Sequence, residues 1–266
     1  MKNKRTRIFE DFGCKMIKSV TPFIAYALTA IGAMLFSLAV VRLHDLATFG
    51  AFSYLFAVIQ ISVLISRRGL MVSIARFAAK EKSLSRFKGL CFANALILKT
   101  SLVMTLLASL YFIIDYFFRG NSNYLIAGLL LATTVTPNAL LVVFSGYIKG
   151  MGKAARSSLF TNGAIYYVVV LFVYVFSFFN LEPLLSVVIA YTLSFFLYSI
   201  ISLWSLIRTF FHQNHNKNHW LSQQILVPAN IMLQTNIATS FVPVLSVWII
   251  GLVLSVEAVG VYKIFQ

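Results

Sequence analysis

Lys99 is the residue whose position most strongly indicates chemistry, because it lies well inside the apolar run 90–114. An ionisable side chain within a membrane span is costly unless it meets water or a partner charge. We therefore interpret Lys99 as a cation that lines a central cavity and meets an anionic headgroup. Two alternatives stay open: a lipid-facing lysine whose ammonium reaches toward the interface, or a span boundary closer to Lys99.

Four further residues are candidates for substrate binding. Arg42 ends an apolar run, where it either contacts substrate or neutralises the last carbonyls of a helix. Arg76 lies in the basic segment 67–88, where it either attracts an anionic substrate or binds lipid headgroups nonspecifically. Leu70, Ile74, Phe77 and Ala78 of this segment have helical spacing, which predicts an amphipathic helix at the membrane interface. Asn138 and Asn236 lie inside apolar runs and either bind polar groups of a substrate or make ordinary interhelical hydrogen bonds.

The sequence lacks the residue patterns of several kinds of catalytic or coupled site. No aspartate or glutamate lies well inside an apolar run. Asp45, Asp115, Glu182 and Glu257 stand at the ends of such runs, and the others lie in the N-terminal tail or in segment 67–88. A phosphate loop with the pattern GK[ST] and a Ser-His-Asp arrangement are also missing. His212, His215 and His219 have spacings that a metal site uses, but no carboxylate or cysteine accompanies them. We expect no enzymatic activity, no cofactor and no bound metal.

The composition places these candidates in a membrane. Of the 266 residues, 60% are hydrophobic and only 11% are charged, whereas soluble domains carry roughly 25% charged residues. Runs near the length of about 20 residues that a helix needs to cross a bilayer occur at 20–41, 47–66, 90–114, 124–148, 159–179, 184–207 and 225–256. Only helices of this length satisfy their own backbone in lipid, so the sequence predicts an all-α polytopic bundle of about seven transmembrane helices. Pro137 and Pro243 should kink their spans.

The distribution of basic residues predicts the orientation of the chain. Lysine and arginine number six before the first run, seven in 67–88, three in 149–156 and two in 208–217, against Arg42 and Arg119 alone in the alternate gaps. Cytoplasmic loops carry such an excess, so we expect a cytoplasmic N-terminus. Most of the residues that give the formal net charge of +15 then lie at the cytoplasmic surface of the membrane, which argues against a nucleic-acid partner.

Three patches carry a resemblance to a known family. They are VVRLHDLATFGAFSYLF, FSGYIKGMGKAARSSL and SVWIIGLVLSVEAVGVYKIFQ, which combine span ends, glycines and basic residues. With the span lengths, they resemble the Wzx-type polysaccharide or O-antigen flippases, in the superfamily that also holds the multidrug and toxin extrusion antiporters. Members resemble two copies of a six-helix bundle. Placing Gly50 over Gly260, an offset of 210 residues, aligns the two copies here.

The resemblance implies both the domains and the function. We expect a basic cytoplasmic tail at 1–19, a six-helix bundle at 20–224 and the start of an incomplete second bundle at 225–266, as in a truncated member. The implied function is a flippase that moves polyprenyl-diphosphate-linked oligosaccharide for O-antigen or capsule synthesis. Lipid-linked oligosaccharide, membrane lipids, a glycan polymerase and glycosyltransferases are the implied partners. The alternatives are a multidrug cation antiporter of the same superfamily and a membrane scaffold for glycan assembly that transports nothing.

Overall fold

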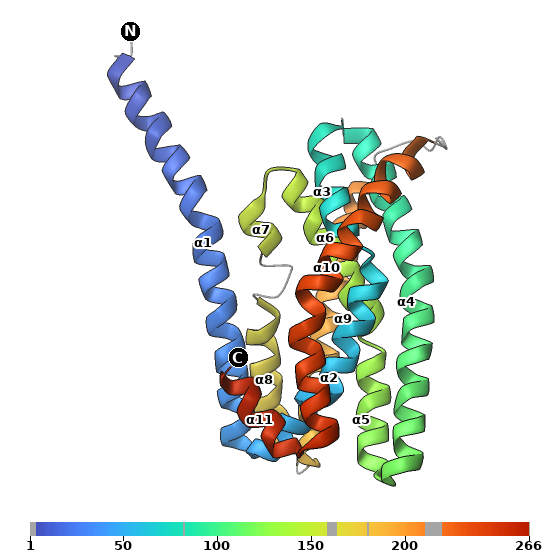
Figure 1. The fold of residues 1–266 in the computed structure, drawn as a ribbon. Helices are drawn as coiled ribbons and strands as arrows, with labels where there is room; N and C mark the ends of the chain where they lie inside the picture. Colours follow the sequence, from blue (N-terminus) through green and yellow to red (C-terminus); the bar gives the residue numbers. More distant parts are fainter. Residues whose placement is uncertain (1–3, 82, 159–163, 180, 211–219, 266) are drawn as a thin grey trace.

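The computed structural model describes residues 4–81, 83–158, 164–179, 181–210 and 220–265, and helices make up nearly all of these residues (Figure 1). The helices are α1 (Lys4–Leu43), α2 (Leu46–Arg67), α3 (Leu70–Lys80), α4 (Ser83–Arg119), α5 (Ser122–Ala132), α6 (Val135–Gly150), α7 (Ala154–Ser158), α8 (Ala164–Ser177), α9 (Pro183–Phe210), α10 (Trp220–Val253) and α11 (Val256–Phe265). No strand occurs within the described ranges. The predicted all-α class is confirmed. The three histidines at 212, 215 and 219 lie outside the described residues.

Each of the seven predicted spans is helical in its described part, although the fourth, 124–148, is divided between α5 and α6. Five helical stretches are long and apolar enough to cross a membrane by length and composition, namely Phe23–Leu43, Leu46–Lys80, Lys88–Phe118, Ser122–Gly150 and Pro183–Ile200. A sixth consists of Ile225–Ala238 and Val242–Val253, which meet at a bend of 46°. The described apolar part of α8, Ile165–Ser177, is shorter than a full span. The helices therefore form a polytopic membrane bundle, with five or six full-length spans in the described residues.

The kink predicted at Pro243 is confirmed, and the helix of the fourth span is interrupted shortly before Pro137. The fourth span breaks between α5 and α6 at Thr133 and Thr134, just before Pro137. Each threonine hydroxyl donates to a carbonyl one turn earlier, at 2.6 Å in both cases, which satisfies backbone groups that the break would leave free. Pro243 lies at the bend of α10, because proline supplies no N–H and crowds the preceding turn.

The basic tail and segment 70–80 are both helical, and the second differs from expectation in its packing. The basic tail continues into the first span as part of one helix, α1, which begins at Lys4. The amphipathic pattern of segment 70–80 is confirmed as α3, with Leu70, Ile74 and Phe77 buried and Arg76 exposed. We expected that apolar face to lie on the membrane surface, but it packs against α6 and α10. The cause is that α3 continues α2 across the break at Arg68 and Gly69, within the single apolar stretch Leu46–Lys80.

The bundle has two main apolar clusters. One joins α1, α2, α5, α8 and α9 through aromatic rings, and the centroids of Phe52 and Tyr191 lie 5.4 Å apart. The other joins α3, α4 and α6 to the start of α10, where Ile225 and Ala229 are fully buried. The seventh span therefore packs directly onto the first bundle. The predicted division at residue 225 stays a prediction.

The start of α2 is stabilised by Asp45, whose carboxylate accepts a hydrogen bond from the backbone N–H of Thr48. Hydrogen bonds with Thr48 lower the pKa of the Asp45 carboxyl below its ordinary value. The cap therefore stabilises the folded protein fully at pH values above the ordinary pKa of an aspartate. This stabilisation is lost as the pH falls through the lowered pKa of Asp45.

We expect Asp45→Ala to lower the free energy of unfolding by about 1 kcal/mol, because an N-cap acceptor is lost. Thermal unfolding of the purified protein at neutral pH measures this change. Asp45→Asn is the matched control, since asparagine also caps a helix but does not titrate. It should keep most of the stability at neutral pH and lose less than the parent protein does below roughly pH 4. Equal stability of the alanine and parent proteins would contradict the role of the cap.

Candidate functional site

A cavity of about 300 Å³ lies between α2 and α4, at the end of α2 that leads into α3. Its lining residues are Ile65, Arg68, Leu96, Lys99, Thr100, Val103 and Met104. Lys99 comes from α4 and Arg68 from the turn between α2 and α3, and no carboxylate lines the cavity beside them. Both cations are solvent-accessible in the protein alone. Two positive groups and an apolar wall make this a pocket for an anion attached to an apolar body.

Lys99 reaches the pocket from the outward-facing side of α4. Leu98, Leu102 and Leu106 on this helix are 43%, 58% and 72% exposed, so the same side also contacts lipid. By contrast, Ser101 is fully buried on the other side. The pocket therefore opens on the side of the bundle. Lys99 lines a cavity, as the first interpretation has it, and it also lies on an outward-facing side of its helix, as the second has it.

Thr100 fixes α4 against the end of α2, next to the pocket. Its hydroxyl lies 2.9 Å from the carbonyl oxygen of Ser66 and also near two carbonyls of its own helix. Ser66 in turn donates to the carbonyl of Ser62 at 2.7 Å and is fully buried. This side-chain bond between helices sets the distance between the last turn of α2 and the turn of α4 that carries Lys99.

Arg68 is placed by a left-handed bend between α2 and α3. Its φ of 44° is the sole positive value of a non-glycine residue in the described ranges, and Gly69 follows with φ 69°. An L-residue in this region costs about 1–2 kcal/mol. The Arg68 N–H still bonds the carbonyl of Ile65 at 3.2 Å, which ends α2. Strain of this kind often accompanies functional positions, and here it brings a guanidinium to the pocket.

The other predicted site residues lie outside this pocket. Arg42 is exposed in the last turn of α1, beyond the opposite end of α2. Arg76 is exposed on α3. Asn138 is buried in α6, and Asn236 is half-buried on α10. The structure thus brings Lys99 together with Arg68, which sequence reasoning had counted only as one charge of a basic loop.

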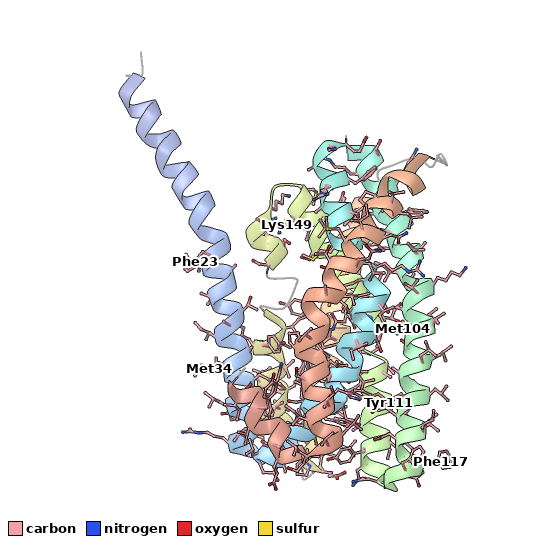
Figure 2. The ribbon with its side chains drawn as sticks, in the orientation of Figure 1. Phe23, Met34, Met104, Tyr111, Phe117 and Lys149 are labelled. Carbon is pink, nitrogen blue, oxygen red and sulfur yellow. The ribbon has the colours of Figure 1, made fainter. Side chains whose placement is uncertain are left out.

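A polar chain of aromatic side chains links three helices further along α2. The hydroxyls of Tyr54 and Tyr111 lie 2.7 Å apart, and the indole N–H of Trp248 donates to the Tyr111 hydroxyl at 3.0 Å. Tyr54 is fully buried on α2, whereas Tyr111 and Trp248 come from α4 and α10. Met104 and Tyr111 follow one another along α4 (Figure 2). This chain fastens α10 to the first bundle and was not found from the sequence.

Three acidic groups next to the spans lie at or near helix ends. Asp45 precedes α2, Asp115 is near the end of α4, and Glu182 precedes α9, where it accepts from the Asn123 amide at 2.6 Å. No group of three or more metal-ligating side chains occurs among the described residues. Within this part of the chain, the spans therefore offer fixed positive charge and no matching buried carboxylate.

Comparison with known proteins places this fold. A family model described as polysaccharide biosynthesis protein matches residues 19–266. The chain belongs to this family. Its fold is similar to that of a MOP superfamily transporter from Pyrococcus furiosus, with a TM-score of 0.62 and 16% identity over 84% of this chain. For that protein, the reverse polarity of its binding pocket is said to suggest a different function. No curated protein matches the chain.

The family predicted from the three sequence patches is thereby confirmed. The chain spans 52% of the length of the Pyrococcus transporter that it matches. The family connects the chain with polysaccharide biosynthesis, and the fold is similar to that of a MOP superfamily transporter.

If the pocket holds water, a cysteine at position 99 will react with a water-soluble maleimide, because the reagent needs a hydrated thiolate. Cys14 and Cys91 are first replaced by serine, and Lys99→Cys is compared with Leu102→Cys, which is exposed on the same helix outside the pocket. We expect Lys99→Cys to react roughly tenfold faster in membranes. Equal, slow labelling of both variants would show that Lys99 faces only acyl chains.

Proposed function

We propose that this transporter moves polyprenyl-diphosphate-linked oligosaccharides across the bacterial inner membrane, for O-antigen or capsule synthesis. The pairing of Arg68 with Lys99 in one carboxylate-free pocket carries this proposal. An arginine fork binds two phosphate oxygens at once, and a lysine adds a mobile point charge, so together they suit a diphosphate. Ile65, Leu96 and Val103 offer an apolar wall for the first part of the polyprenyl chain.

The lateral opening of the pocket suits a substrate that stays anchored in the bilayer. The exposed leucines of α4 flank Lys99, so a lipid tail can remain among acyl chains while its headgroup meets the cations. A soluble anion needs no such route. The family's connection to polysaccharide biosynthesis supports a glycan as the group carried on the diphosphate.

We further propose that the N-terminus is cytoplasmic. The excess of lysine and arginine in alternate gaps supports this orientation. The N-terminus and α3 lie at the same end of the bundle, so Arg68 then lies toward the cytoplasm (Figure 1). The pocket would load substrate from the inner leaflet, where glycosyltransferases complete it, and a glycan polymerase would receive it on the other side. Arg76, exposed on α3, would attract anionic headgroups to this end.

A multidrug cation antiporter is the second candidate, but it requires a buried carboxylate to hold its ion and attract its substrates. The pocket offers arginine and lysine instead. Under the third candidate, a scaffold, the pocket cations would have no effect on transport. The same variants therefore separate all three.

We expect Lys99→Gln and Arg68→Gln each to slow transport roughly ten- to a hundredfold, since a charge-assisted bond of about 1.5–3 kcal/mol is removed. Transport of a lipid-linked oligosaccharide by the protein in vesicles measures the rate. Lys99→Arg should retain most of it. Lys153→Gln, an exposed cation between α6 and α7, is the control and should change nothing.

Normal glycan transport by both glutamine variants would remove the pocket from the pathway. Faster export of an organic cation by Lys99→Gln would favour the antiporter, and absence of any transport by the parent protein would favour the scaffold.

A further inference from the structure

The exposed side chains of α4 show how deep the pocket of Lys99 and Arg68 lies in the membrane. Large apolar residues are exposed on this helix from Leu98 to Phe118. Among the described residues 88–97 of the same helix, by contrast, no large apolar side chain is exposed. A long row of exposed apolar residues marks a membrane-facing surface. The lipid-facing part of α4 therefore begins next to Lys99.

The length of this lipid-facing part matches one bilayer. Lys99 and Arg119, the last residue of α4, are 20 positions apart, which is about 30 Å of helix. Arg68 and Leu46, the first residue of α2, are 22 positions apart, or about 33 Å. A hydrocarbon core is about 30 Å thick, so both cations lie at its edge, where the phosphates of phospholipids begin. The alternative of a span boundary closer to Lys99, which the sequence left open, is the one that this pattern supports.

Other helices agree with this boundary. Along the bundle, Phe117 lies near one end, and Phe23 and then Lys149 follow in the direction of the N-terminus (Figure 2). Phe23 is an exposed apolar residue, whereas Lys149 is an exposed cation. Helix α3 lies at the same end as Lys149 and exposes Arg76 and Lys80 (Figure 1). Exposed apolar residues thus give way to exposed cations at this edge, which belongs to the inner leaflet in the orientation proposed above.

The pocket has the size and lining of a site for a lipid headgroup. Its volume of about 300 Å³ is near the lower limit for small-ligand sites, so it holds a phosphate and the first carbons beside it but not a whole lipid. Lys99 and Arg68 supply charge-assisted donors for phosphate oxygens. No carboxylate lines the pocket to hold the ammonium of a zwitterionic headgroup. The lining therefore favours an anionic lipid over a zwitterionic one.

Exposed apolar side chains continue from the pocket along α4 in the direction of Phe118. They are Leu102, Val103, Leu106, Leu107 and Leu110, and Val103 lines the pocket itself. One leaflet of hydrocarbon is about 15 Å deep, which corresponds to about ten residues of helix. This row is therefore long enough to contact one acyl chain of a lipid whose phosphate lies in the pocket.

We propose that the pocket of Lys99 and Arg68 is also a binding site for an anionic phospholipid of the surrounding leaflet, such as phosphatidylglycerol. The phosphate lies between the two cations, and one acyl chain lies along the exposed leucines of α4. This site rests on the pocket alone and not on the proposed function. If the protein moves a lipid-linked diphosphate, that substrate must displace the phospholipid, and its larger negative charge favours the exchange.

Lipid binding to the purified full chain tests the site without any transport. The protein in detergent is titrated with phosphatidylglycerol or with phosphatidylcholine of the same acyl chains, and native mass spectrometry gives the dissociation constant of the first lipid bound. We expect tighter binding of phosphatidylglycerol. Lys99→Gln and Arg68→Gln should each weaken it roughly fivefold, because each cation near the surface attracts an anionic lipid by about that factor. Binding of phosphatidylcholine should not change.

Arg76→Gln and Lys153→Gln are the matched controls, because both cations are exposed at the same end but do not line the pocket. Neither should change the first dissociation constant, and Lys99→Arg should keep it. Equal affinity of the parent protein for the two lipids, or equal weakening in all four glutamine variants, would overturn the site. If Arg68→Gln fails to fold because of its strained backbone, Lys99→Gln on an exposed helix surface decides.

Two competitors separate the possible sources of the phosphate. Glycerol phosphate carries the same charged group without acyl chains, and even in large excess it should not displace bound phosphatidylglycerol. Displacement by an equal concentration of glycerol phosphate would show a site for free phosphate and overturn the proposal. Farnesyl diphosphate should displace the phospholipid if the substrate shares the pocket. If it does not, the pocket is a phospholipid site alone, and the proposed route of the diphosphate is wrong.

Discussion

Close approach of helix backbones at glycine is the constraint on which this structure depends. In a bilayer, apolar side chains gain little by leaving lipid, so helices associate through van der Waals contact at small residues. Gly50 meets the start of α11, Gly146 meets α3 at Met71, and Gly69 would carry a Cβ only 2.5 Å from the carbonyl of Ala229 in α10. Larger side chains instead project outward into lipid, as Phe23 and Met34 do on α1 (Figure 2).

The same constraint produces the pocket. Gly69 touches α10 only because the chain takes two successive left-handed residues after α2, and the first of these is Arg68. The break between α2 and α3 therefore also places the Arg68 guanidinium in the pocket that Lys99 lines. Thr100 then joins α4 to the end of α2 through the Ser66 carbonyl. A packing requirement and a binding site share one turn of the chain.

Sequence periodicity and length were enough to predict the class, the spans, the proline breaks and the buried side of α3, because each depends on residues near one another in the chain. The offset of 210 residues also paired Gly50 with Gly260, and these two glycines lie where α2 and α11 pack against one another. The shared pocket of Lys99 and Arg68 was not visible in the sequence. A basic loop contains several cations, and its sequence does not show which of them lies against a neighbouring helix. The chain of Tyr54, Tyr111 and Trp248 was missed for the same reason: it joins three helices whose relative rotation follows only from packing.

Helix α2 carries the proposed binding pocket near one end and the crossing with α11 at the other. Its backbone bonds make it stiff along its length, and the Thr100 bond ties its last turn to α4. A displacement of one end of α2 must therefore either tilt the helix as a whole or bend it. If α2 tilted alone, Arg68 would move relative to Lys99. The Tyr54–Tyr111 hydrogen bond, however, joins α2 to α4, so α4 tilts together with α2. The two interhelical bonds thus favour motion of α2 and α4 as one body, with the two pocket cations kept together throughout.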